Sequence, residues 1–332
     1  MSKVYLPRVL EFMDSSFKYN IHLYESMISI TPFLIGFEYK NEKLHENIER
    51  EKQKLDETGQ VIEERQADID VKRGDQMLSQ SIDVLREMNR EGFYRLWCFQ
   101  FEEEKGRDFG GLKREWTQTV FQEFLMNKSE NSDLFNNDFG NHKLFLLSIY
   151  INETNPNFWK YEIFGKFLAK VIIDKEKVSQ SFPKFFYKLL LNRQLCFTDL
   201  LEFDEDVYNS CRWLKENQVP DNIGMYFVHE IKTSNIPISY NLKENGDKIE
   251  VTEENKEELI KLKIHFLLIE SIEKQVNKIQ EGILKIIDPK YFFMFSHNEL
   301  EKLICGIEEI NSYINSSKFE RKYNINRIRE NK

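Results

Sequence analysis

Four cysteines are the side chains of this 332-residue chain best suited to a covalent intermediate: Cys98, Cys196, Cys211 and Cys305. No Cys-x-x-Cys pair occurs, which disfavours a disulfide framework or zinc ribbon and favours a reducing compartment. Before Cys305, Ser296 and Glu299 fit a capping box, and Gly306 suits a helix end. Carbonyl groups at that helix end disfavour a thiolate, so we expect Cys305 to be structural.

The remaining cysteines show little sign of activation. Cys98 falls within LWCFQFE (96–102), an aromatic segment that predicts a buried strand, and is expected to be inert. Cys196 has only Arg193 close in sequence as an activator. We therefore expect no catalytic residue in this chain.

Metal and nucleotide chemistry are disfavoured by spacing. The six histidines have no i, i+4 ligand partner and no cysteine at ligand spacing, so no metal site is expected. GRDFGG (106–111) nearly forms a phosphate loop, but Leu112-Lys113-Arg114 stands where Lys-Ser/Thr is required. A tight strand-to-helix turn explains these glycines better, and no cofactor is expected.

Composition limits the partners. The chain is 41% hydrophobic, enough for a sizeable core in one large domain or two. A net charge of −9 argues against nucleic acid and for a neutral or basic protein partner. The chain shows no signal-peptide pattern and no apolar run of roughly 18 residues, so we expect no membrane span and a cytoplasmic or nuclear location.

Periodicity predicts an α+β fold in which helices dominate. Residues 38–75 are dense in both charges and predict a solvated helix and linker. Apolar helical faces follow Asn155-Pro156, Pro183 and Asp204, which suit helix starts. ISYNLKENGDKIEVT (238–252) carries Asn-Gly between alternating arms and predicts a hairpin, after which a long helix starts at Thr252.

Several segments together resemble the HECT ubiquitin ligase family. The most specific are GRDFGGLKREW (106–116), YNLKENGDKIEVTEENKEE (240–258), IEKQ (272–275) and EG (281–282). Supporting segments, in the order found in relatives, are NPNFWKYEIFGKFLAK (155–170), FPKFFYKLLLN (182–192), TDLLEFDEDVYNSCRWLKEN (198–217) and LEKLICGIEEI (300–310).

The resemblance implies a lobe that docks a partner. The family's catalytic domain has an N-lobe, which binds a ubiquitin-conjugating enzyme, and a C-lobe, whose cysteine lies in a His-Thr-Cys-Phe context. No such motif occurs in this sequence, which ends roughly where the hinge between lobes begins in relatives. The resemblance therefore implies an N-lobe alone, with a large mainly helical subdomain and a smaller inserted α/β subdomain.

The implied division has five parts. They are a charged helical extension (1–65), the first part of the large subdomain (66–197), the conjugating-enzyme-binding subdomain (198–284), the closing part of the large subdomain (285–315), and the start of an inter-lobe linker or tail (316–332).

Full HECT domains pass ubiquitin from the conjugating enzyme to the C-lobe cysteine as a thioester, and then to a substrate lysine. Without that thiol, this chain alone is expected to be inactive and to act as a platform. Its implied partners are a ubiquitin-conjugating enzyme carrying a ubiquitin thioester, ubiquitin itself, and the C-lobe.

The docking groove in relatives is apolar and built from a helix, a strand and the start of the long helix. Matching motifs assigns nine residues to it: Val207, Ser210, Cys211, Leu214, Ile223, Met225, Tyr226, Leu259 and Lys263. The first four also fall at i, i+3/i+4, i+7, which fits either a groove or a plain core stripe. Cys211 stands where leucine is common, and Leu259 and Lys263 where aromatic residues occur.

Two alternatives remain beside the docking lobe. One is a degenerate ligase that uses Cys196 or Cys211 as the ubiquitin carrier. The other is an interaction scaffold without ubiquitin chemistry.

Overall fold

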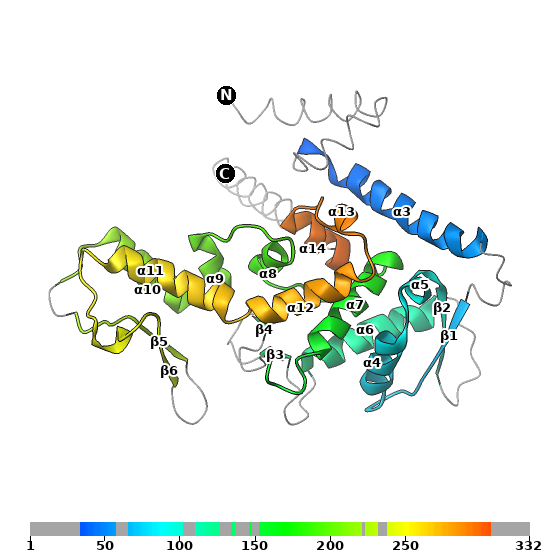
Figure 1. Cartoon of the computed structure of the whole chain (residues 1–332), viewed down its shortest axis with the longest axis horizontal. Helices are drawn as coiled ribbons and strands as arrows, with labels where there is room; N and C mark the ends of the chain where they lie inside the picture. Colours follow the sequence, from blue (N-terminus) through cyan, green and yellow to red (C-terminus); the bar gives the residue numbers. More distant parts are fainter. Residues whose placement is uncertain are drawn as a thin grey trace, which may run out of the picture.

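Figure 1 shows a computed structural model of the chain. The residues that the structure describes are 34–57, 66–101, 110–126, 134–136, 146–147, 153–220, 223–231 and 238–306. The described elements are α3 (Phe37–Glu57), β1 (Gln66–Val71), α4 (Met77–Glu87), α5 (Arg90–Tyr94), β2 (Leu96–Phe101), α6 (Gly111–Met126), β3 (Phe135–Asn136), β4 (Leu146–Leu147), α7 (Lys160–Ile173), α8 (Lys184–Leu190), α9 (Leu200–Phe203), α10 (Glu205–Glu216), β5 (Val228–Ile231), β6 (Ile238–Asn241), α11 (Lys256–His265), α12 (Glu273–Leu284), α13 (Pro289–Phe292) and α14 (His297–Cys305).

Helices dominate, and the strands form two-stranded sheets, so the predicted helix-dominant α+β class is confirmed. In the described part of the chain, no helix is both long and apolar enough to span a bilayer.

Helix α7 lies at the centre of the larger body. Its sequence is apolar around most of its circumference, which requires neighbours on several sides. Helices α4, α5, α12 and α14 supply them. Pro183 directly precedes α8, as predicted, whereas α7 starts at Lys160, after a turn begun by Asn155, whose side chain accepts a hydrogen bond from Asn157 N at 2.8 Å.

An aromatic cluster fills the space between α7 and the sheet beside it. The strand predicted over residues 96–102 is present as β2, which pairs with β1 in parallel, and α6 packs on β2. The rings of Trp97 and Trp116 lie 5.7 Å apart, and Trp116 lies 5.7 Å from Phe167. The first of these contacts is edge-on and the second is tilted, and such ring pairs stabilise the core beyond the apolar area that they bury.

The crossing of α7 and α12 is unusually close. A Cβ on Gly165 would lie 2.0 Å from Ile279 O, and one on Gly282 would lie 2.0 Å from Glu162 O. Only glycine permits this approach at both positions. Beside the crossing, Glu162 pairs with Lys278 at 2.9 Å and with Lys285 at 2.6 Å.

A smaller unit projects from this body. In Figure 1 a group of elements lies at the left, beyond the left-hand end of α12: α9, α10, α11 and the β5–β6 pair. We call residues 200–270 the projecting end. A π-helical segment, Phe266–Glu270, closes it and leads into α12, which itself packs on α7 and α8. π-Helical segments within helices frequently occur at functional sites.

The hairpin expected over residues 238–252 is wrong. Strand β6 pairs instead with β5, antiparallel, with Tyr240 opposite His229. Asn245 does adopt the left-handed conformation expected of an Asn-Gly turn (φ 54°). The carbonyl of Gly246, however, accepts a hydrogen bond from Phe227 N at 3.0 Å, so the turn packs on the chain before β5. The residues after the turn therefore do not pair with β6. The helix expected from Thr252 begins at Lys256.

Helix α3 differs from the solvated helix that its charges predicted. Leu44 and Ile48 are buried, and Lys40, which is 1% exposed, pairs with Glu299 at 2.7 Å. Glu299 also completes the predicted capping box of α14 with Ser296, and Gly306 ends α14 at φ 70°. One carboxylate therefore both caps α14 and holds α3. Residues 1–33, 58–65 and 307–332, which include the whole of the predicted tail (316–332), lie outside the described residues.

Replacing Gly165 with alanine should lower the free energy of unfolding by about 2–3 kcal/mol, because the added methyl must push α7 and α12 apart. Chemical denaturation measures this change. Gly111→Ala is the matched control: its Cβ meets nothing within 4 Å, so the variant should be neutral or slightly more stable. An unchanged stability for Gly165→Ala would contradict the close crossing.

Candidate protein-docking site

Helix α10 is built by local signals. Asp204 accepts a hydrogen bond from Val207 N at 3.0 Å, which confirms the predicted cap. Glu205 and Asp206 occupy the first turn and Lys215 the last, so the charges complement the helix dipole. This cap fixes where α10 begins.

One face of α10 is core. Cys211 and Leu214 on α10 and Leu259 on α11 are at most 1% exposed, where these two helices pack together. Burial raises the pKa of the Cys211 thiol, against a weaker opposing effect from nearby Lys263. These three of the nine assigned residues therefore stabilise the projecting end, and a docked protein would not touch their side chains without a rearrangement.

The segment before β5 supplies three further assigned residues. It was expected to be a strand, but β5 starts only at Val228, and Tyr226 makes a single bridge to Glu250. Met225 O accepts a hydrogen bond from Val251 N at 2.8 Å, which ties the segment to the chain before α11. Tyr226 is 39% exposed, whereas Ile223 and Met225 are partly buried.

Six assigned residues keep exposed area and stay candidates for docking. Ser210 and Tyr226 are exposed, and the other four are half-buried: Val207, Ile223, Met225 and Lys263. Lys263 lies near His229, and burial together with that ammonium lowers the pKa of the imidazole. The Phe266 ring packs against His229 at 5.8 Å, so this corner is held by rings as well as charge.

The structure adds Trp213, which was not assigned from the sequence. Its side chain is 43% exposed, whereas most large apolar side chains described are buried. Trp213 lies three residues after exposed Ser210, so both lie on the solvent side of α10. In the sequence, the spacing of Ser210 and Trp213, three residues apart, could have indicated an exposed face of the helix. The family resemblance instead assigned Cys211 and Leu214, which lie on the buried face.

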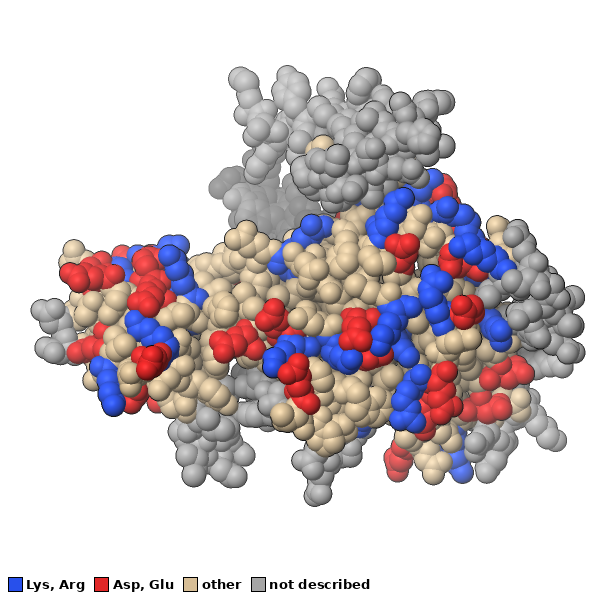
Figure 2. Space-filling model, viewed as in Figure 1, with Lys and Arg blue, Asp and Glu red and all other residues tan. Residues whose placement is uncertain are grey.

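The same part of the chain carries most of the net charge. Residues 198–284 contain 18 acidic and 10 basic side chains, a net charge of −8 within a chain of −9. Figure 2 shows acidic side chains gathered at the projecting end, interspersed with fewer basic ones. A docking partner would therefore meet exposed aromatic area within a negative field, which suits a basic surface.

The Cys305 thiol, at the end of α14, is buried in surroundings that disfavour its thiolate form. Cys305 lies 3.2 Å from Tyr187 Oη and 3.3 Å from Gln180 O. Burial raises the pKa of Cys305 to about 11. The prediction that Cys305 lies in the last turn of a helix ended by Gly306 is confirmed.

Cys196 is the exposed thiol of the four, all of which are described. Its Sγ lies 3.7 Å from Lys188 Nζ and 3.2 Å from Asp199 Oδ2. Lys188 itself pairs with Asp199 at 2.7 Å, so its charge is already shared with that carboxylate. Cys98 is half-buried in β2. Among the described residues, no three His, Cys, Asp or Glu side chains gather as a metal site would require.

Comparison with known proteins identifies the fold. The model of the HECT-domain (ubiquitin-transferase) family matches residues 118–330. The chain belongs to the HECT-domain family. This match contains all nine assigned residues and Trp213, while the motifs upstream of residue 118 lie outside it.

Individual HECT proteins are similar over most of this chain. The E3 ubiquitin-protein ligase NEDD4 of Homo sapiens is 29% identical over 242 residues, which are 70% of this chain and 17% of that protein. NEDD4 of Mus musculus is 28% identical over 242 residues, 70% of this chain and 26% of that protein. NEDD4 of Rattus norvegicus is 29% identical over 246 residues, which are 70% of this chain and 26% of that protein. This HECT chain therefore spans about a quarter or less of the curated relatives it matches.

Alkylation of the native chain should label Cys196 first, with Cys211 and Cys305 at least about tenfold slower, because Cys196 is exposed whereas the other two thiols are buried with raised pKa values. Mass spectrometry of timed iodoacetamide reactions measures each site. In denaturant all four cysteines should react at similar rates. Native labelling of Cys211 as fast as Cys196 would show that α10 and α11 do not pack as described.

Proposed function

We propose that this HECT-family chain docks a ubiquitin-conjugating enzyme through residues 198–284, as an N-lobe that presents the enzyme's ubiquitin thioester to a cysteine outside this sequence. The observation that carries the proposal is the exposure of Trp213 and Tyr226 on an acidic projecting end. Tryptophan and tyrosine are the residue types that most often dominate binding energy at protein interfaces.

The reaction served by this lobe is acyl transfer. The acceptor thiolate attacks the thioester carbonyl of ubiquitin, the new carbon–sulfur bond forms, and the conjugating enzyme's thiolate leaves. The step needs an accessible thiolate. Cys211 and Cys305 are buried with raised pKa values, and Cys98 is half-buried in a strand. The proposed role of the chain is therefore to bind and orient.

The charge of the projecting end adds rate and selectivity to this docking. Exposed carboxylates attract a basic partner from a distance, which mainly raises the association rate and weakens with salt. The aromatic side chains then supply the short-range contact. Four free thiols fit a reducing compartment, and we place the protein in the cytoplasm or nucleus.

One observation favours the alternative of a degenerate ligase that carries ubiquitin itself. Cys196 is exposed and has an ammonium group, that of Lys188, at 3.7 Å. Against it, the Lys188 ammonium is already paired with Asp199 at 2.7 Å, and Asp199 Oδ2 itself lies 3.2 Å from the Cys196 Sγ. For Cys211, the other residue considered for this role, burial leaves no route for a second protein.

Trp213→Asp and Tyr226→Asp should each weaken binding to a charged conjugating enzyme at least about tenfold, because each puts an unpaired carboxylate at the centre of the proposed contact. Biolayer interferometry against a panel of these enzymes measures the change. Leu96→Asp is the matched control: Leu96 is 52% exposed but lies on the larger body. Equal effects at all three positions, or no binding to any enzyme of the panel, would contradict the proposal.

Incubation with charged conjugating enzyme should leave no thiol-sensitive ubiquitin adduct on this chain. A non-reducing gel, repeated after treatment with a reducing agent, measures it. An adduct that is lost in Cys196→Ser but kept in Cys211→Ser would replace the docking proposal with the degenerate ligase. Cys211→Ser serves as the control because its site is buried.

A further inference from the structure

A cavity lies at the opposite end of the molecule from α10. It is open to solvent, has a volume of about 630 Å³, and is lined by α3, the corner between α5 and β2, the first turn of α6 and the end of α7. In Figure 1 these elements lie at the right, with the projecting end at the left. Cavities of this size commonly hold small molecules.

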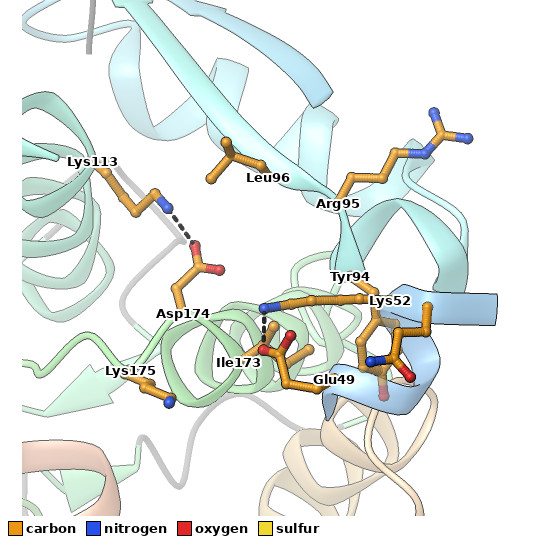
Figure 3. A pocket seen from close by; sticks show the side chains of 10 residues that line it. Glu49, Lys52, Tyr94, Arg95, Leu96, Lys113, Ile173, Asp174 and Lys175 are labelled. Atoms are coloured by element: carbon orange, nitrogen blue, oxygen red, sulfur yellow. Dashed lines mark hydrogen bonds and ion pairs between the residues drawn. The ribbon is translucent and has the colours of Figure 1, made fainter. Parts of the chain in front are cut away.

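Basic side chains outnumber acidic ones around this cavity. Its lining includes four basic and two acidic residues: Lys52, Arg95, Lys113, Lys175, Glu49 and Asp174. Lys52 pairs with Glu49 at 2.9 Å, and Lys113 lies 3.4 Å from Asp174, so both acids are engaged. Figure 3 shows Lys52 and Lys113 reaching toward the middle of the cavity from different sides.

Two of the basic residues, Lys175 and Arg95, have a charged or polar group without a partner among the described residues. Lys175 is exposed at the rim and forms no ion pair within the described part of the chain. Arg95 Nε is buried and finds no hydrogen-bond partner among the described residues. The Arg95 guanidinium points away from Lys52 and Lys113 in Figure 3.

A fifth cation lies behind the cavity wall. Lys170, 2% exposed, donates to Phe93 O at 3.0 Å and to Arg95 O at 3.1 Å, and it pairs with Asp174 at 3.0 Å. Asp174 is therefore shared between Lys170 and Lys113. One carboxylate facing two ammonium groups leaves positive charge uncompensated at this wall.

Neighbouring groups respond to that excess. The pKa of Lys170 is lowered to about 8, mainly by burial, with Lys113 and Lys52 adding to the effect. The pKa of His45, on α3 beside Lys175, is lowered to about 4, mainly by burial and then by Lys175, Lys177 and Lys52. Lys52 thus opposes protonation of both Lys170 and His45, and other lysines act on one or the other of these groups.

We propose that this cavity binds a small phosphorylated molecule, whose phosphate oxygens are held by Lys52, Lys113 and Lys175. Phosphate is the common biological anion that accepts from several ammonium groups at once. A bound phosphate would take over part of the pairing that Lys52 and Lys113 make with Glu49 and Asp174. It would also link α3 to the body, because Lys52 lies on α3 and Lys113 on α6.

Isothermal titration of the full chain with inorganic pyrophosphate at fixed ionic strength tests the site. Lys175→Asn should weaken binding about tenfold, and asparagine tolerates the positive φ of 61° at this position. Glu49→Gln should tighten binding, because it removes an acid from the lining. Lys261→Gln changes an exposed lysine of α11, on the projecting end, and should leave binding unchanged.

The pKa of His45 provides a local readout. Saturating pyrophosphate should raise it, because an anion beside Lys175 offsets the lysine charges; proton NMR of the imidazole measures the shift. His229 is the matched control, since its pKa is also lowered by burial but it lies on the projecting end.

Absent binding, equal affinities for Lys175→Asn and Glu49→Gln, or an unmoved His45 would each overturn the proposal. None of these outcomes bears on the docking of a conjugating enzyme, which is tested at the other end of the chain.

Discussion

The contact between Gly165 and Gly282 is the constraint on which the rest of the molecule depends. At this crossing the backbones of α7 and α12 approach so closely that a Cβ on either glycine would force the two helices apart. Helix α7 is the centre of the larger body, and α12 continues through the π-helical segment into α11. The crossing therefore sets where the projecting end leaves the body, and the pairs from Glu162 to Lys278 and Lys285 reinforce it.

The thiols show how this fold separates binding from covalent chemistry. Cys211 and Cys305 serve packing at helix contacts, where burial raises the pKa of each thiol and withholds the thiolate. Solvent-facing positions of α10 instead hold Ser210 and Trp213. A surface of this kind can hold a partner's reactive bond in place, which is the role proposed for this member of the HECT-domain family.

Charge is distributed unevenly along the molecule. The segment 198–284 carries a net charge of −8, whereas basic side chains predominate around the cavity between α3 and the end of α7. Opposite ends of one chain therefore favour opposite ligands, a basic protein at one and an anion at the other. Distance and solvent screening keep the two fields largely independent.

The sequence by itself determined what depends on neighbours along the chain. The cap at Asp204, the capping box of Ser296 and Glu299, the turn at Gly306 and the strand around Trp97 were all predicted, because short-range hydrogen bonds and periodicity decide them. Tertiary structure alone decided the rest: that β6 pairs with β5 rather than with the chain after Asn245, and that the Leu214 face of α10 is buried while Trp213 is exposed. These outcomes depend on which distant segment occupies each side of an element. An apolar stripe looks the same in a sequence whether a helix of the same chain or another protein covers it.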